Sequence, residues 1–209
     1  MKRDIRNQKG ALIILIEKGL KIWIKSKCNK IKDLELNING LDISFLKGKL
    51  SRINVKGKEI NFQYLPINHI ELTSSEINIE LKELYKIHIK ENFEVFGKLE
   101  FNGYLLKEAL LSDRWKFLGE WFSSELLGMK YLIDLKINNQ EMEIEATDEK
   151  QSYIKKSHFR VSQKSGKLLF TNLADKVENF LPADQSIKID DVFLNKGNLL
   201  IKGKAIITP

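Results

Sequence analysis

The chain has 209 residues, of which 43% are hydrophobic and 9% aromatic, and its formal net charge is +7. This length and apolar content allow one sizeable core, as one largish domain or two small ones. The single cysteine, Cys28, excludes an intramolecular disulfide and a cysteine-based metal site, which fits a reducing compartment.

The most apolar stretch near the N-terminus is GALIILIEKGLKIWIKSK, residues 10–27. A membrane-spanning helix needs about 20 mostly apolar residues, whereas the uninterrupted run here extends only from Ala11 to Ile16. The charged residues that follow would each cost about 2.5 to 3.5 kcal/mol at the centre of a bilayer. The run is also short for a signal peptide, and no small-residue cleavage site follows it. We therefore expect a cytoplasmic protein without a transmembrane helix.

The same stretch has an apolar stripe at helical spacing opposite a basic face, which is typical of an amphipathic helix. The stripe comprises Ile13, Ile16, Leu20, Trp23, Ile24, Cys28 and Ile31. Two interpretations are open at this point. The helix either docks on the protein's own core or lies in the plane of a membrane surface with Trp23 at the headgroup level.

The positive charge is concentrated in residues 1–32, which contain ten Lys or Arg and two acids, a net of +8, while residues 33–209 have a net charge of −1. A polybasic segment gains about 1 kcal/mol per Lys or Arg near an anionic leaflet. We therefore predict a peripheral membrane protein that contacts an anionic surface. The candidate contact residues are Lys2, Arg3, Arg6, Lys9, Lys18, Lys21, Trp23, Lys25 and Lys27.

The same charges could bind nucleic acid. Proteins that bind single strands also present several aromatic side chains on which bases stack. Trp23 is the only aromatic residue of this segment, so nucleic acid is the less favoured partner.

Beyond Asp33 the hydrophobic period changes from 3.6 to 2, which predicts strands with one solvated face in an antiparallel sheet. The alternating residues are Leu34, Leu36 and Ile38; Leu41, Ile43 and Phe45; Ile53 and Val55; Ile77, Ile79 and Leu81; and Tyr85, Ile87 and Ile89. Turn signals at residues 46–49, 138–140, 164–166 and 195–198 separate the segments. The pattern predicts a meander.

Three predicted strands carry a glycine at a similar place, in VKGKEI (55–60), VFGKLE (95–100) and IKGKAI (201–206). Glycine in a strand interior usually marks a bulge, a bend or a close backbone approach. We therefore predict one strongly curved sheet that forms a trough. This makes the fold class α+β, with the curved sheet wrapped along one long or broken helix and an amphipathic helix at the N-terminus.

The helix that would fill the trough lies within residues 102–128, with a break near Ser112 and Asp113, where Ser112 could cap a second helix. Its apolar face is ordinary core or, in the sharper interpretation, the wall of an acyl-chain site. The candidate wall residues are Leu106, Leu110, Phe117, Leu118, Trp121, Phe122 and Leu126.

The segment FEVFGKLEFNGYLLKEALLS, residues 93–112, resembles the signature of the LmeA-like bacterial phospholipid-binding family, in which a Phe-x-Val-x-Gly strand runs directly into a Leu-x-x-Ala-Leu-x-Ser helix. The matching residues are Phe93, Val95, Gly97, Leu106, Ala109, Leu110 and Ser112. The hairpin around Gly48 and Gly57 and the closing residues 187–207 also resemble the family's first and last hairpins. Two departures are Tyr104 and Leu105, where the family has polar residues, and the missing export signal.

This resemblance implies a fold related to tubular lipid-binding proteins, in which acyl chains lie between a curled sheet and a helix. The family signature contains no catalytic residue. The sequence adds none, since His69, His88 and His158 lack metal-ligand spacing and no nucleophile elbow, phosphate loop or calcium loop is present. We expect no enzyme, no cofactor and no metal site.

The sequence thus predicts a basic amphipathic helix segment at 1–32 and a single lipid-binding-like domain at 33–209. The expected function is non-enzymatic binding or transfer of a phospholipid or other acyl lipid at a membrane surface. The alternative is a membrane-associated scaffold or interaction protein with a packed core, whose basic segment binds a protein or nucleic-acid partner.

Overall fold

The computed structural model describes residues 2–39, 48–82, 86–150 and 152–209, and for some of them, including 2–13, the backbone alone. Within these residues the protein is α+β, with three helices and three antiparallel sheets. The helices are α1 (Lys2–Lys27), α3 (Gly103–Leu111) and α4 (Lys116–Leu127).

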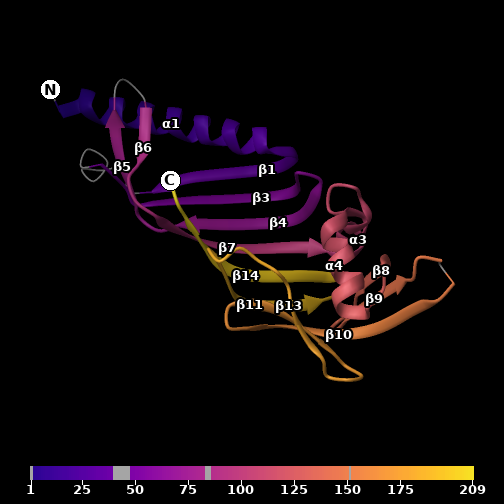
Figure 1. Cartoon of the computed structure of the whole chain (residues 1–209). Coiled ribbons are helices and arrows are strands. Elements are labelled where there is room, and N and C mark those ends of the chain that lie inside the picture. The colour runs from indigo at the N-terminus through magenta and orange to yellow at the C-terminus, as the bar shows by residue number, and fades with distance from the viewer. Residues whose placement is uncertain (1, 40–47, 83–85, 151) are drawn as a thin grey trace.

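The first sheet has the strand order β1-β3-β4-β7-β14-β13 and forms the centre of the molecule (Figure 1). Its strands are β1 (Cys28–Asn39), β3 (Arg52–Phe62), β4 (Leu65–Ser74), β7 (Phe93–Asn102), β14 (Asn198–Ile207) and β13 (Ile187–Asn195). Every neighbouring pair is antiparallel. The predicted alternation at 34–38 and 53–55 lies in β1 and β3, which confirms both strands.

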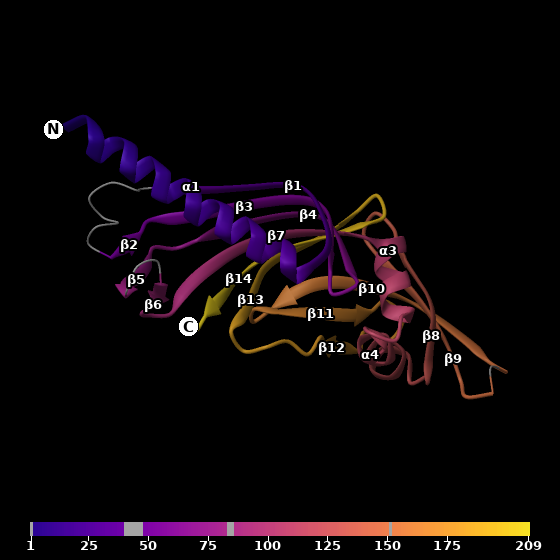
Figure 2. The same cartoon turned by 90° about the horizontal axis from the view of Figure 1, so that it is seen from above.

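The second sheet has the order β12-β11-β10-β9-β8 and lies with α3 and α4 at one end of the first sheet (Figures 1 and 2). Its strands are β8 (Tyr131–Ile137), β9 (Met142–Thr147), β10 (Ile154–Lys164), β11 (Lys167–Asn172) and β12 (Glu178–Phe180). The predicted turns at 138–140, 164–166 and 195–198 each join two consecutive strands.

The third sheet is small, with the order β2-β5-β6, and comprises β2 (Lys49–Leu50), β5 (Ile77–Lys82) and β6 (Lys86–Ile89). It lies at the end of the molecule opposite to the second sheet, where the N-terminus of α1 also lies (Figures 1 and 2). β5 confirms the predicted alternation at 77–81. The strand expected from Leu41, Ile43 and Phe45 lies outside the described residues, as does Tyr85.

Two hydrophobic cores hold these layers together. The main core lies between the end of the first sheet, the second sheet and helices α3 and α4, and Phe101, Leu110 and Ile144 are among its buried residues. The smaller core comprises Leu36, Ile38, Leu50, Ile77 and Ile79, with α1 packed against it.

The prediction of one strongly curved meander wrapped along a helix is wrong. The strands are divided among three sheets, none of them strongly curled, and β14 lies between β7 and β13. The strand glycines serve close packing instead. Gly97 and Gly203 are register partners, and a Cβ on Gly203 would lie 2.4 Å from the carbonyl oxygen of Lys188.

The predicted break in the helical stretch is confirmed, because α3 ends at Leu111 and α4 begins at Lys116. Ser112 does not cap the second helix, however. Its hydroxyl donates to the carbonyl of Ala109 at 2.6 Å and so closes the end of α3.

The N-terminal helix ends at Lys27, four residues before the end of its predicted stripe. Cys28 instead starts β1 and is paired with Phe62 of β3. The side chain of Asn29 accepts a hydrogen bond from the backbone N–H of Tyr64 at 3.3 Å. Pairing with β3 therefore overrides the helical pattern of Cys28 and Ile31.

The close approach at Gly203 gives a stability prediction. Gly203→Ala should destabilise the protein by about 1 to 3 kcal/mol, because the new methyl group would overlap a carbonyl oxygen. The control is Gly19→Ala, since no atom lies within 4 Å of its added Cβ and alanine favours a helix by about 0.5 to 1 kcal/mol. Urea unfolding of both variants measures the difference. Equal midpoints would show that β13 and β14 do not approach closely at Gly203.

Candidate functional site

The seven candidate wall residues do not share one surface. Leu106, Leu110, Phe122 and Leu126 are buried in the main core, and Leu118 and Trp121 are partly buried against it. Phe117 is 64% exposed and is not among the residues of this core. The structure therefore brings six of the seven together as packed core and leaves the seventh in solvent.

An aromatic cluster fills the space between α4 and the second sheet. The ring of Trp121 lies 5.3 Å from that of Phe122 and 5.7 Å from that of Phe170, and the rings of Phe122 and Phe170 are 5.4 Å apart. All three pairs have the edge-to-face geometry that stabilises aromatic cores. An acyl chain at this place would have to displace these rings.

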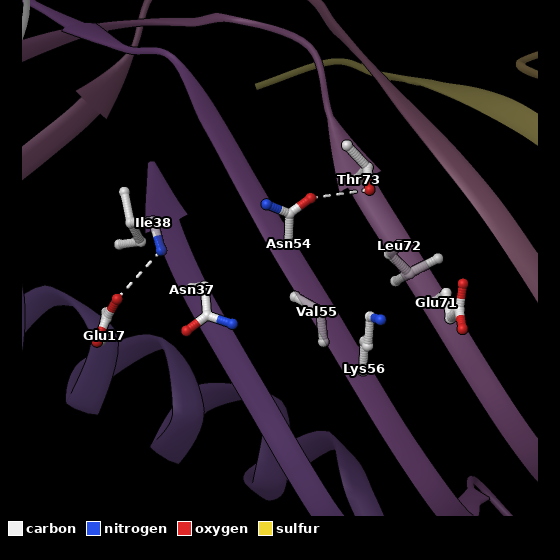
Figure 3. Close-up of a pocket in the computed structure, with 9 residues that line it drawn as sticks. All are labelled: Glu17, Asn37, Ile38, Asn54, Val55, Lys56, Glu71, Leu72 and Thr73. Atoms are coloured by element: carbon white, nitrogen blue, oxygen red, sulfur yellow. Dashed lines mark hydrogen bonds between the residues drawn. The ribbon is translucent and has the colours of Figure 1, made fainter. Parts of the chain in front are cut away.

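A hollow of about 520 Å³ lies elsewhere, between α1 and strands β1, β3 and β4 (Figure 3). Its lining is Glu17, Asn37, Ile38, Asn54, Val55, Lys56, Glu71, Leu72 and Thr73. The strand register places Asn37, Asn54 and Thr73 in one row across the sheet, and the Thr73 hydroxyl donates to the Asn54 side chain at 3.0 Å. The polar alternation of these strands was visible in the sequence, but their pairing was not.

The hollow is bounded on one side by α1. The carboxylate of Glu17 reaches from α1 to β1 and accepts a hydrogen bond from the backbone N–H of Ile38 at 3.1 Å (Figure 3). On the opposite side, a hydrogen bond from His69 lowers the pKa of Glu71, and Lys56 and Lys98 act in the same direction. The hollow therefore has a polar, charged lining.

The apolar stripe of α1 packs on the protein itself. Ile16, Leu20 and Ile24 contact the smaller core around Leu36 and Ile38. This supports docking on the protein's own core for these three residues. Trp23, which the helical spacing placed in the same stripe, is 58% exposed.

The solvent face of α1 combines apolar and basic side chains. Ile14 and Trp23 are exposed, and Ile22 is 69% exposed. Lys18 and Lys25 are exposed on the same helix, and Lys21 is partly exposed. The side chains of Lys2, Arg3, Arg6 and Lys9 lie outside the described part of the structure.

The lysines on the solvent face of α1 differ in their ion pairing from many lysines in the rest of the protein. Within the described residues, Lys18, Lys21 and Lys25 form no salt bridge, and the Lys27 ammonium lies 6.0 Å from the centre of the Trp23 ring. Many lysines of the body are paired with carboxylates, among them Lys30, Lys32, Lys49, Lys116, Lys130, Lys136, Lys156, Lys164, Lys202 and Lys204. The charges of Lys18, Lys21 and Lys25 are therefore not neutralised by described side chains.

The second sheet has its own ion-pair network on the face away from the main core. Lys156 contacts Glu143 at 2.8 Å and Glu145 at 3.2 Å. The hydrogen bond from Lys156 lowers the pKa of Glu143, although burial opposes the shift. His158 approaches Glu143 and Glu141 at 3.7 and 3.3 Å. The acids of this face thus form a cluster whose charge is compensated by Lys136 and Lys156.

Within the described residues, no group of three or more His, Cys, Asp or Glu side chains could hold a metal ion. His69 lies 2.9 Å from Glu71, and His88 is exposed on β6. Burial raises the pKa of the Cys28 thiol. Among the described helices, none combines the length and the apolar character that crossing a bilayer requires, including the 26-residue α1.

The different environments of Phe122 and Phe117 give a matched pair of variants. Phe122→Ala should destabilise the protein by about 3 to 5 kcal/mol, because it leaves a cavity in the main core. Phe117→Ala removes an exposed ring and should change stability by less than about 0.5 kcal/mol. Guanidinium unfolding of both variants measures the two effects. A small loss for Phe122→Ala would mean that the interior can accommodate an empty space there, as an acyl-chain site requires.

No family model, curated protein or solved structure matches the chain. The resemblance of residues 93–112 to the LmeA-like family therefore remains a prediction. It is carried by seven residues of which Leu106, Ala109 and Leu110 are buried.

Proposed function

We propose that this protein is a non-enzymatic, peripheral phospholipid-binding protein that attaches to an anionic membrane surface through the solvent face of α1. The observation that carries the proposal is the combination on that face of exposed Ile14 and Ile22 with Lys18 and Lys25, which have no carboxylate partner among the described residues, and of exposed Trp23 at the edge of the face. We expect attachment from the cytoplasmic side, where anionic lipids are concentrated.

The composition of the face fits a helix that lies in the plane of the interface. Each lysine near an anionic leaflet contributes about 1 kcal/mol of attraction, and this attraction weakens as salt is added. Isoleucine and tryptophan side chains can then enter the boundary between headgroups and acyl chains. Because the opposite face of α1 remains packed on Leu36 and Ile38, the helix need not leave the protein to bind.

Reversal of charge on α1 tests the proposal. Lys18→Glu combined with Lys25→Glu should weaken binding to vesicles of phosphatidylglycerol and phosphatidylcholine at least tenfold, because two attractive contacts become repulsive. Vesicle co-sedimentation at low and at physiological salt measures the affinity. The natural protein should bind vesicles of phosphatidylcholine alone much more weakly.

The matched control reverses Lys150 of the β9–β10 connection and Lys167 of β11, Lys150→Glu with Lys167→Glu, which changes the net charge by the same amount. Both residues are exposed and lie away from α1. The control should bind like the natural protein. Equal loss in both double variants would mean that overall charge, and not the α1 face, controls binding, and it would refute the proposal.

A second function is favoured by the packing of the main core. Because Trp121, Phe122 and Phe170 fill the space beside α4, the protein could be a membrane-associated interaction protein that takes up no lipid. Its basic segment would then bind a protein or nucleic-acid partner in addition to the membrane.

Native mass spectrometry of protein purified without detergent separates acyl-chain uptake from surface contact. We expect the mass of the bare chain both before and after incubation with mixed liposomes, because the core beside α4 is filled. Lipid extraction from the same sample is the control. A phospholipid retained at one molecule per chain would instead establish an internal acyl-chain site.

A further inference from the structure

An exposed aromatic surface lies at the end of the first sheet where α1 ends. We name it the aromatic tip and define it as Phe62, Tyr64, Trp115 and Phe117. Tyr64 is 60% exposed, Phe117 is 64% exposed, and Phe62 and Trp115 are less so. Phe62 ends β3 and Tyr64 lies in the β3–β4 turn, while Trp115 lies in the α3–α4 connection and Phe117 in the first turn of α4.

Hydrogen bonds hold the two parts of the tip together. The indole Nε1 of Trp115 donates to the carbonyl oxygen of Gln63 at 2.9 Å, and Arg114 donates to the Gln63 side chain at 3.1 Å. The rings of Trp115 and Phe117 lie 5.8 Å apart. Because the polar atom of Trp115 is already satisfied, its ring can enter an apolar layer without losing a hydrogen bond to water.

The turn that carries Tyr64 has an unfavourable backbone. Gln63 and Tyr64 both have positive φ, 50° and 68°. Two-residue turns of this kind strongly favour asparagine and glycine, since a bulky side chain is strained there. Because Tyr64 is 60% exposed, its packing can offset only part of this strain. Strain of this kind often accompanies a functional role of the side chain.

The aromatic tip is continuous with the C-terminal end of α1. Lys27, the last residue of the helix, is followed by Cys28, which pairs with Phe62. Both views place the end of α1, the β3–β4 turn and the α3–α4 connection at the same end of the molecule (Figures 1 and 2). The tip can therefore meet the surface that α1 meets.

Charges near the tip nearly cancel. Arg114 and Lys116 are accompanied by Asp113 and Glu120, and Lys116 lies 3.8 Å from Glu120. Attraction at the tip therefore does not come from net charge. Tyrosine and tryptophan rings with one polar atom are the side chains that accumulate at the headgroup level of membranes.

We propose that the aromatic tip is a second membrane contact, which inserts into the interfacial layer of a phospholipid bilayer while α1 supplies the electrostatic attraction. This inference rests on the proposed function of α1. Two independent signals are the usual requirement for stable attachment of a peripheral protein, because a single weak anchor is readily reversible.

The double variant Tyr64→Gly with Phe117→Ser tests the second contact. Glycine relieves the strain at position 64, so the fold should be retained and thermal unfolding should show it. Binding to vesicles of phosphatidylglycerol and phosphatidylcholine should weaken about tenfold, because two apolar surfaces no longer enter the interface. The salt dependence of binding should stay that of the natural protein, since no charge changes. The control is Tyr153→Ser with Phe180→Ser, which removes two exposed rings from the second-sheet region.

The outcomes separate the two proposals. If the natural protein binds anionic vesicles and the tip variant binds equally well, the aromatic tip makes no membrane contact and the α1 proposal stands. An equal loss in the tip variant and in the control overturns the tip as a specific site. If the natural protein binds no vesicles, the α1 proposal fails and the tip proposal fails with it.

Discussion

The length of the apolar face of the first sheet is the constraint on which the arrangement of the other elements depends. β1 and β3 have 12 and 11 residues, about 35 Å of strand at about 3.3 Å per residue, and the two ends of this face belong to separate cores. On β3, Val55 packs toward the smaller core and Ile60 belongs to the main core. The chain therefore needs two covers, α1 with the third sheet at one end and α3, α4 and the second sheet at the other.

Local patterns in the sequence predicted the elements, and long-range pairing could not be predicted. The alternation of Leu36 and Ile38 and the turn at 195–198 were sufficient for strands and a hairpin. Glycine spacing alone cannot distinguish a bend from a close approach. That distinction depends on which strand lies beside each glycine, such as β13 with Lys188 beside Gly203 and β4 with Leu72 beside Gly97. The number of sheets was missed for the same reason.

The candidate site was predictable in composition but not in orientation. Helical periodicity identified the apolar residues of α1 and α4, yet it placed Trp23 and Phe117 on buried faces although both are exposed. Phe117 lies in the first turn of α4, and Trp23 lies about 100° around α1 from Ile24, which stays packed on the smaller core. The hollow beside Glu17 depends on the register of three strands. The hydrogen bond of Trp115 to Gln63 depends on a contact between two connections far apart in the chain. No local sequence pattern contains either.

The hydrogen bond from the backbone N–H of Ile38 to the Glu17 carboxylate holds α1 against the edge of the first sheet. β1 is the edge strand of the first sheet, and unpaired edge strands invite pairing with other chains. Because α1 satisfies a backbone group of this edge and buries Leu36, the helix cannot lift away without exposing both. A surface that holds α1 thus holds the whole sheet at a fixed inclination, so that the strands of the protein acquire a defined orientation relative to that surface.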